Sequence, residues 1–253
     1  MSGAGRWAFE ELRAHADAII EGAAAHGVVV RLTGGIGIRD RAARLGGLEA
    51  GSRHYHDIDV VGRLKQVRRL EELFRRLGYR PDTEINTQFG TVRRVYHHPA
   101  GFHVDLFFER LEFCHTINVN GRLDLQPRTL APADLLLQKL QIIERNAKDF
   151  FDVYLLMLNH ELGEADAQRI ELDRLTALTS EDWGLFTTAC DFLDDALRLA
   201  PVTPMDDQAR QALGARLDAV RTVLEQAPKS LRWKARSRVG RRVRWYRVVE
   251  EVL

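Results

Sequence analysis

Cysteine is scarce in this chain of 253 residues, which contains only Cys114 and Cys190. Two isolated cysteines provide neither a disulfide framework nor a Cys-x-x-Cys pair, so we expect a reduced, intracellular setting. Long apolar runs are missing as well. None reaches the roughly 18 residues of a membrane span, and the first residues lack the apolar segment of a secretion signal. We therefore expect a cytoplasmic protein that has no membrane partner.

An excess of charge is also missing from the chain as a whole. Lys and Arg number 37 and Asp and Glu number 36, which gives a formal net charge of +1. The total charge thus indicates neither a nucleic-acid nor a membrane partner, and only the distribution of charge can do so.

The one lopsided stretch is 229–247, which we call the basic tail: it holds nine Lys and Arg residues and no acidic residue, with Trp233, Trp245 and Tyr246 among them. Two interpretations stay open. The tail is a solvated or acid-paired segment whose aromatic residues anchor it to its own domain, or it is a strip that binds the phosphates of RNA or tRNA.

Apolar residues recur at both helical and strand spacing up to about residue 160 and at helical spacing alone beyond it. Strands are predicted at 28–32, 57–61, 91–96 and 102–108. Helices are predicted at 9–25, 36–45, 66–77, 133–145, 149–160, about 166–178, 182–199 and 206–226. The order predicts an α/β (α+β) core over 1–127, followed by a helical C-terminal region over 128–253.

Two aspartates separated by one isoleucine mark the strand at 57–61. Residues i and i+2 of a strand point to the same face, so Asp57 and Asp59 stand side by side. A divalent cation between two such carboxylates allows both to stay ionised. Asp105 interrupts the apolar strand at 102–108, where an unpaired carboxylate is costly to bury, and it is the third predicted carboxylate of the site.

Further charged residues interrupt the apolar helices that follow. Lys139 shares the apolar face of the helix at 133–145 and therefore needs a partner. Asp149 and Asp152 are three residues apart and share a helix face, and Arg145 joins them only if the helix runs through 146–148.

A glycine pair after a strand, a same-face aspartate pair and a third aspartate on a later strand form the chemical plan of Mg2+-dependent phosphoryl transfer. Three stretches resemble the nucleotidyltransferase superfamily, as seen in aminoglycoside nucleotidyltransferases and abortive-infection type toxins. They are Gly34-Gly35, the run from Arg53 to Asp59, and Val104-Asp105-Leu106. The stretches 134–140 and 148–152 resemble the lysine and Lys-Asp helix motifs of its toxin-like branch.

The resemblance implies a mixed β-sheet flanked by helices, an NTP donor, and transfer of a nucleoside monophosphate to a hydroxyl of RNA, tRNA or a small molecule. It also implies that Asp57, Asp59 and Asp105 hold Mg2+ or Mn2+, and that Asp149 and Asp152 position the acceptor or a base. Donor binding is expected from the glycine pair and from basic residues, namely Gly34, Gly35, Arg39, Arg53, Lys139 and Lys148.

One position departs from the family pattern. The family has Ser or Thr directly after the glycine pair, where its hydroxyl contacts the donor phosphates, whereas this chain has Ile36. Either backbone groups and Arg39 then bind the donor phosphates in place of the hydroxyl, or the protein has lost catalytic turnover. The alternative to an enzyme is thus a catalytically degenerate module of the same fold that binds a nucleotide or a partner protein. The resemblance to the toxin-like branch raises the question of an antitoxin partner, which the sequence does not answer.

Overall fold

The computed structural model describes residues 7–48, 53–164, 166 and 168–249. The chain divides into two compact units. The first consists of Met1–Arg41, Ala50–Leu111 and Asn118–Leu130, and the second of Ala42–Glu49, Glu112–Ile117 and Ala131–Leu253. The predicted boundary after residue 127 stays a prediction; the contact-based division runs to Leu130 and assigns two short earlier stretches to the second unit.

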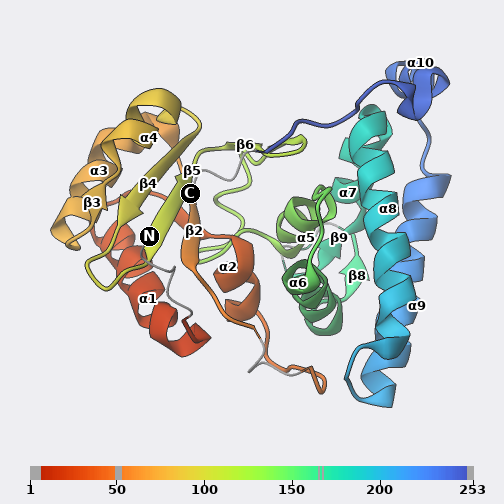
Figure 1. Cartoon of the computed structure of the whole chain (residues 1–253), viewed down its shortest axis with the longest axis horizontal. Coiled ribbons are helices and arrows are strands. Elements are labelled where there is room, and N and C mark those ends of the chain that lie inside the picture. The colour runs from red at the N-terminus through yellow and green to blue at the C-terminus, as the bar shows by residue number, and fades with distance from the viewer. Residues whose placement is uncertain (1–6, 49–52, 165, 167, 250–253) are drawn as a thin grey trace. The chain divides into compact units, whose positions relative to one another are not determined.

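A five-stranded mixed sheet forms the centre of the first unit (Figure 1). Its order is β1-β2-β5-β4-β3, with β2 and β5 parallel and the other pairs antiparallel. The strands are β1 (Val30–Leu32), β2 (Asp57–Gly62), β3 (Arg80–Pro81), β4 (Arg93–His97) and β5 (His103–Phe107). The predicted α/β class with a mixed sheet is confirmed.

One face of this sheet packs against the apolar stripes of α1 (Phe9–Ala25) and α3 (Val67–Arg76). The buried cluster joins Leu12, Leu70 and Phe74 of the helices to Ile58 and Val104 of the central strands. Because side chains alternate along a strand, residues 57, 59, 103 and 105 stand on the opposite face. The first unit is completed by a 3-10 turn (Leu64–Gln66), α2 (Gly34–Asp40) and α4 (Thr83–Phe89).

A later segment closes the outer edge of β1. The Leu32 amide donates to the Arg128 carbonyl at 2.8 Å, and the Leu130 amide donates to the Leu32 carbonyl at 3.0 Å. The Arg128 guanidinium also pairs with Asp40 at 2.7 Å and with Asp17. Residues 128–130 therefore act as a short additional edge, which belongs to the first unit although it comes about a hundred residues after β1.

The second unit is mainly helical, and α8 and α9 run alongside each other (Figure 1). Its helices are α5 (Pro132–Leu140), α6 (Ala147–Asn159), α7 (Leu172–Glu181), α8 (Trp183–Leu199), α9 (Asp207–Gln226) and α10 (Leu231–Val239), with 3-10 turns at Ala200–Val202 and Gly240–Arg242. Two short sheets pair β6 (Arg110–Glu112) with β7 (Thr116–Asn118) and β8 (Leu162–Gly163) with β9 (Ile170–Glu171). None of the described helices combines the length and apolar character needed to cross a bilayer.

Several predicted bounds are wrong. The helix predicted at 36–45 begins at Gly34 and ends at Asp40, and the helix predicted at 133–145 ends at Leu140. The prediction of helices alone beyond residue 161 missed β8 and β9, whose two-residue strands are too short to show a period. The helix predicted at about 166–178 is α7, which begins at Leu172; residue 167 of that prediction lies outside the described part of the chain.

Candidate active site

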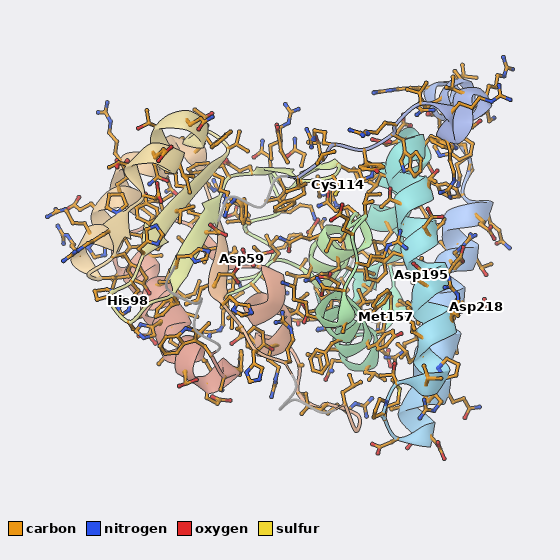
Figure 2. All side chains as sticks on the ribbon, in the orientation of Figure 1. Asp59, His98, Cys114, Met157, Asp195 and Asp218 are labelled. Atoms are coloured by element: carbon orange, nitrogen blue, oxygen red, sulfur yellow. The ribbon has the colours of Figure 1, made fainter. Side chains whose placement is uncertain are left out.

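The parallel pairing of β2 and β5 sets four polar side chains next to each other. Asp57 lies opposite His103, and Asp59 lies opposite Asp105. All four stand on the sheet face that α1 and α3 do not cover, since Ile58 and Val104 between them point into the apolar core. Figure 2 labels Asp59 among the strands of the first unit. The predicted meeting of three aspartates from two strands thus follows from register alone.

A group on this face that could hold a metal ion contains a histidine. One ligand atom each from Asp57, His103 and Asp105 lies within 4.8 Å of the other two. Asp59 does not join this group, and its Oδ2 instead lies beside the backbone of Gly34. His103 was not among the predicted site residues, although its position two residues before Asp105 on the same strand face was the available signal.

A second missed residue is Arg93 on β4, which binds Asp105 in a bidentate ion pair. The Arg93 Nη2 lies 2.9 Å from Oδ1 and 3.0 Å from Oδ2, and Nε lies 3.1 Å from Oδ1. The Asp105 side chain is 7% exposed, so its charge needs such a partner. The sequence alone does not reveal this contact, because it depends on the register between β4 and β5.

Electrostatics tie His103 to the same carboxylates. Its Nε2 lies 3.7 Å from the Asp105 Oδ2. Contact with Asp105 raises the pKa of His103 above its ordinary value; burial opposes this shift, and the charges of Asp57 and Asp59 add to it. The face is therefore a negative site that favours a cation.

The glycine pair allows a close approach at the start of α2. Gly34 has φ of +59°, and a Cβ there would lie 1.8 Å from the Asp59 Oδ2. A Cβ on Gly35 would lie 2.3 Å from Nη2 of Arg53. Gly34 therefore excludes larger residues, and the two glycines place the helix backbone directly against an acidic and a basic side chain.

The next side chain, Ile36, points away from this approach. It is 2% exposed and belongs to the core cluster of the first unit. The other predicted donor residues of this unit pack on aromatic rings. The Arg39 guanidinium carbon lies 4.9 Å from the Phe9 ring centroid, and that of Arg53 lies 4.3 Å from the Tyr55 ring centroid.

The remaining predicted residues belong to the second unit. Lys139 Nζ lies 3.0 Å from Asp149 Oδ1 and 2.8 Å from Asp152 Oδ2, and all three residues are buried. Burial by itself lowers the pKa of Lys139, but the charges of Asp152 and Asp149 outweigh it and raise that pKa. The structure thus supplies the partners that Lys139 was expected to need. Lys148 is exposed at the start of α6.

Asp149 also caps α6. Its Oδ2 accepts a hydrogen bond from the Asn146 amide at 3.1 Å, while the Asn146 side chain accepts one from the Lys148 amide at 3.0 Å. Arg145 does not join this cluster, because the helix is interrupted between α5 and α6. Its side chain instead pairs with Asp195 and donates to the Asp191 carbonyl at 3.1 Å.

The aromatic residues of the basic tail turn toward the second unit. Trp233 packs on Phe186 with ring centroids 5.3 Å apart, and Trp245 packs on Trp183 at 6.1 Å. Trp245 also donates through Nε1 to the Thr188 hydroxyl at 3.1 Å. This favours the anchoring interpretation for the indole side chains rather than a role in base stacking.

The acid pairing of the tail is incomplete. Arg241 pairs with Asp191 and Arg247 with Glu112. Among the described residues no acidic partner is found for five exposed side chains: Arg232, Lys234, Arg238, Arg242 and Arg244.

The side chains of the group formed by Asp57, His103 and Asp105 fit a divalent cation. Carboxylate oxygens suit Mg2+ and Mn2+, and one imidazole nitrogen adds a ligand that first-row transition metals accept more readily than Mg2+ does. Arg93 already occupies the Asp105 carboxylate, so a metal at this position shares or replaces that contact.

Comparisons with known proteins give likenesses to solved structures, among them the following two. No protein-family model and no curated protein sequence matches the chain. The antibiotic-resistance factor ANT(2'')-Ia, an aminoglycoside nucleotidyltransferase, aligns at 14% identity over 72% of this chain and 91% of its own, with a TM-score of 0.41. An antigenic nucleotidyltransferase-like protein from Paracoccidioides brasiliensis aligns at 13% identity over 82% of this chain and 95% of its own, with a TM-score of 0.49.

Both of these proteins bear the class name that the sequence motifs resemble. Identities and TM-scores this low assign no activity to the chain. Any functional assignment therefore depends on the chain's own residues.

Proposed function

We propose that this protein is a metal-dependent nucleotidyltransferase that transfers a nucleoside monophosphate from an NTP to a hydroxyl acceptor. The observation that carries the proposal is the group formed by Asp57, His103 and Asp105 on adjacent parallel strands, with Asp59 on the same face beside the glycine pair. Few other reactions call for several carboxylates next to a backbone that a triphosphate can approach closely.

In this reaction the acceptor oxygen forms a bond to the α-phosphorus of the NTP. The bond from that phosphorus to the β-bridging oxygen breaks, pyrophosphate leaves with the electron pair, and the hydroxyl proton passes to a carboxylate of the site. Asp57, Asp105 and His103 would hold Mg2+ or Mn2+, with Asp59 as a further proposed ligand. The metal would neutralise charge on the phosphates and orient them.

For the donor, we assign the triphosphate to the backbone at Gly34 and Gly35, with Arg39 and Arg53 as flanking cations. The missing Cβ atoms let the Asp59 and Arg53 side chains lie directly against this backbone, and the proposal places the phosphates beside them. Roles of Lys139 and Lys148 in donor binding, and of Asp149 and Asp152 in acceptor binding, rest on the resemblance alone. The ion pairs of Lys139 mean that a phosphate bound there competes with two carboxylates.

For the acceptor, we favour RNA, tRNA included, over a small molecule. The five basic side chains of the tail that have no acidic partner among the described residues support this choice, because phosphate contacts dominate affinity for nucleic acid. A small hydroxyl compound is the competing acceptor.

The test uses each NTP labelled at the α-phosphate, with Mg2+ or Mn2+, and offers total RNA or a panel of aminoglycosides as acceptor. Label is expected in the RNA fraction. Asp57→Asn should lower the rate of label incorporation at least about a hundredfold, because the lost metal ligand carries several kcal/mol of charge stabilisation. The matched control is Asp124→Asn, which removes an exposed carboxylate of the same unit that pairs with Arg63. Equal rates in Asp57→Asn and the wild type would refute the site.

A second candidate is the degenerate binding module. Two observations favour it: Ile36 places an apolar side chain in the core where the family has a hydroxyl, and Arg93 engages the Asp105 carboxylate. It predicts that no label reaches either acceptor while NTP still binds in equilibrium dialysis.

A further inference from the structure

Asp105 is a predicted metal ligand whose two oxygens are both already bonded to a cation of the chain itself. Arg93 contacts Oδ1 at 2.9 Å and Oδ2 at 3.0 Å through Nη2, and its Nε adds a third contact to Oδ1 at 3.1 Å. The Asp105 side chain is 7% exposed and that of Arg93 is 24% exposed. The carboxylate is thus largely shielded from water, and a bidentate guanidinium contact is stronger there than at the surface.

The same carboxylate belongs to the group that fits a metal. Ligand atoms of Asp57, His103 and Asp105 lie within 4.8 Å of one another. A divalent cation placed among them needs an oxygen of Asp105 that Arg93 now holds. It also brings two positive charges next to the positively charged guanidinium.

The Arg93 side chain has a second contact besides the one with Asp105. Its guanidinium carbon lies 5.8 Å from the ring centroid of Phe107, which lies two residues after Asp105 on the same strand face. A guanidinium that leaves Asp105 can keep this cation–π contact.

We infer that Arg93 is an internal counter-cation of the candidate metal site, which a divalent cation must displace from Asp105 and which thereby sets the metal affinity of the protein. This inference rests on the proposed function, because that proposal supplies the metal site. In the metal-free chain Arg93 keeps Asp57 and Asp105 from repelling each other. When metal binds, that task passes to the ion, and the guanidinium is released toward the face where the donor phosphates are proposed to lie.

The experiment titrates Mn2+ into the full-length protein without nucleotide, by calorimetry. Arg93→Gln removes the competing charge and should bind Mn2+ about tenfold more tightly than the wild type, in line with the coupling measured for close charge pairs. Arg93→Lys keeps the charge but loses the bidentate contact, so its affinity should lie between the two.

The matched control is Arg94→Gln. Arg94 is the next residue on β4 and forms an ion pair with Glu71 of α3, on the opposite face of the sheet. Its replacement removes the same charge and one ion pair and should leave the Mn2+ affinity unchanged. Thermal unfolding with and without Mn2+ gives an independent measurement: the metal should raise the melting temperature of Arg93→Gln more than that of the wild type.

Mn2+ affinity in Arg93→Gln equal to or weaker than that of the wild type overturns the inference, and so does an equal gain in Arg94→Gln. Failure of both the wild type and the variants to bind millimolar Mn2+ overturns it too. Should Arg93→Gln not fold, Arg93→Lys decides the matter by the same comparison with the wild type. Tighter binding in Arg93→Gln without any labelled product would leave the inference standing while the proposed transferase fails. Labelled product without tighter binding would reject the inference alone.

Discussion

His115 is a histidine that its surroundings keep uncharged. It is 5% exposed, and its Nε2 lies 2.9 Å from the Thr188 hydroxyl. That hydroxyl already accepts a hydrogen bond from the Trp245 indole, so it has its own proton to donate to a neutral imidazole. Burial lowers the pKa of His115 to about 4, while nearby Asp182 opposes and Arg247 adds to this shift.

The stability of the protein should therefore depend on pH through His115. Its folded pKa lies below the ordinary value of about 6.5, so the unfolded chain takes up the proton first as pH falls. The contribution is fully present above pH ~6.5 and is lost progressively toward pH ~4, with about 2 kcal/mol gone at pH ~5.

Urea unfolding of the wild type and of His115→Gln at neutral and acidic pH measures this loss. The glutamine variant should lose less stability than the wild type between the two pH values, and His98→Gln serves as a comparison at another histidine of lowered pKa. Parallel pH profiles for the wild type and His115→Gln would contradict the prediction.

At the scale of elements, Lys139 joins α5 to α6. It lies on α5, its two carboxylate partners lie on α6, and all three side chains are at most 10% exposed. A buried pair of this kind adds little net stability compared with apolar packing, but the removal of one partner leaves a charge without compensation.

Lys139→Met should thus lower the free energy of unfolding by about 3–5 kcal/mol, because Asp149 and Asp152 are left buried next to each other. Asn146→Ala, which removes a cap of the same helix, should cost only about 1 kcal/mol. Denaturant titrations of both variants check this order. A loss below that of Asn146→Ala would show that the cluster is not buried as described. Loss of activity in Lys139→Met is informative about donor binding only for the folded fraction.

Elements with a wide apolar face were the predictable ones. α1 has the predicted bounds of 9–25, because Leu12, Ala16, Ile19 and Ala23 follow the helical period and are all buried. The unpredicted α4 has no buried residue at all, so no period exists in its sequence. It is held by its N-cap, where the Asp82 side chain accepts from the Ile85 amide at 3.0 Å. A single capping residue is a weak signal without an apolar stripe behind it.

In the candidate site, too, some features were predictable from the local sequence and others were not. Alternation along each strand was enough to place Asp57 and Asp59 together on one face of β2 and Asp105 on the polar face of β5, whereas the meeting of these two faces depends on the parallel pairing of the strands. The Arg93 contact and the inward direction of Ile36 depend on the register between strands and on the angle at which α2 leaves β1. Neither is encoded in a local pattern, and both determine how the site can work.

At the scale of the whole molecule, the chain is nearly neutral although one of its segments is strongly basic. The net charge is +1, whereas the tail carries nine basic residues and no acid. Because its indoles pack inward, RNA binding by the tail would depend on phosphate contacts and therefore on salt.

Replacement of Arg238, Arg242 and Arg244 together by Gln should weaken RNA binding and lower the slope of log affinity against log salt by up to about 0.7–0.9 for each lost contact. The control replaces Lys65, Arg68 and Arg75, three exposed basic residues of the first unit. Fluorescence anisotropy with labelled tRNA over a salt series measures both variants. An equal loss in the control would mean that overall charge, not the tail, binds the RNA.

The segment at 128–130 that closes the edge of β1 has a consequence during synthesis. On the side of β1 that faces away from β2, Leu32 pairs with Arg128 and Leu130, so a nascent chain carries an unpaired strand edge until about a hundred further residues have left the ribosome. Open edges of this kind pair with other chains. A fragment that stops at residue 127 keeps that edge open permanently and also loses the Arg128 bridge to Asp40 and Asp17. Expression of the first unit on its own therefore calls for a fragment that reaches Leu130.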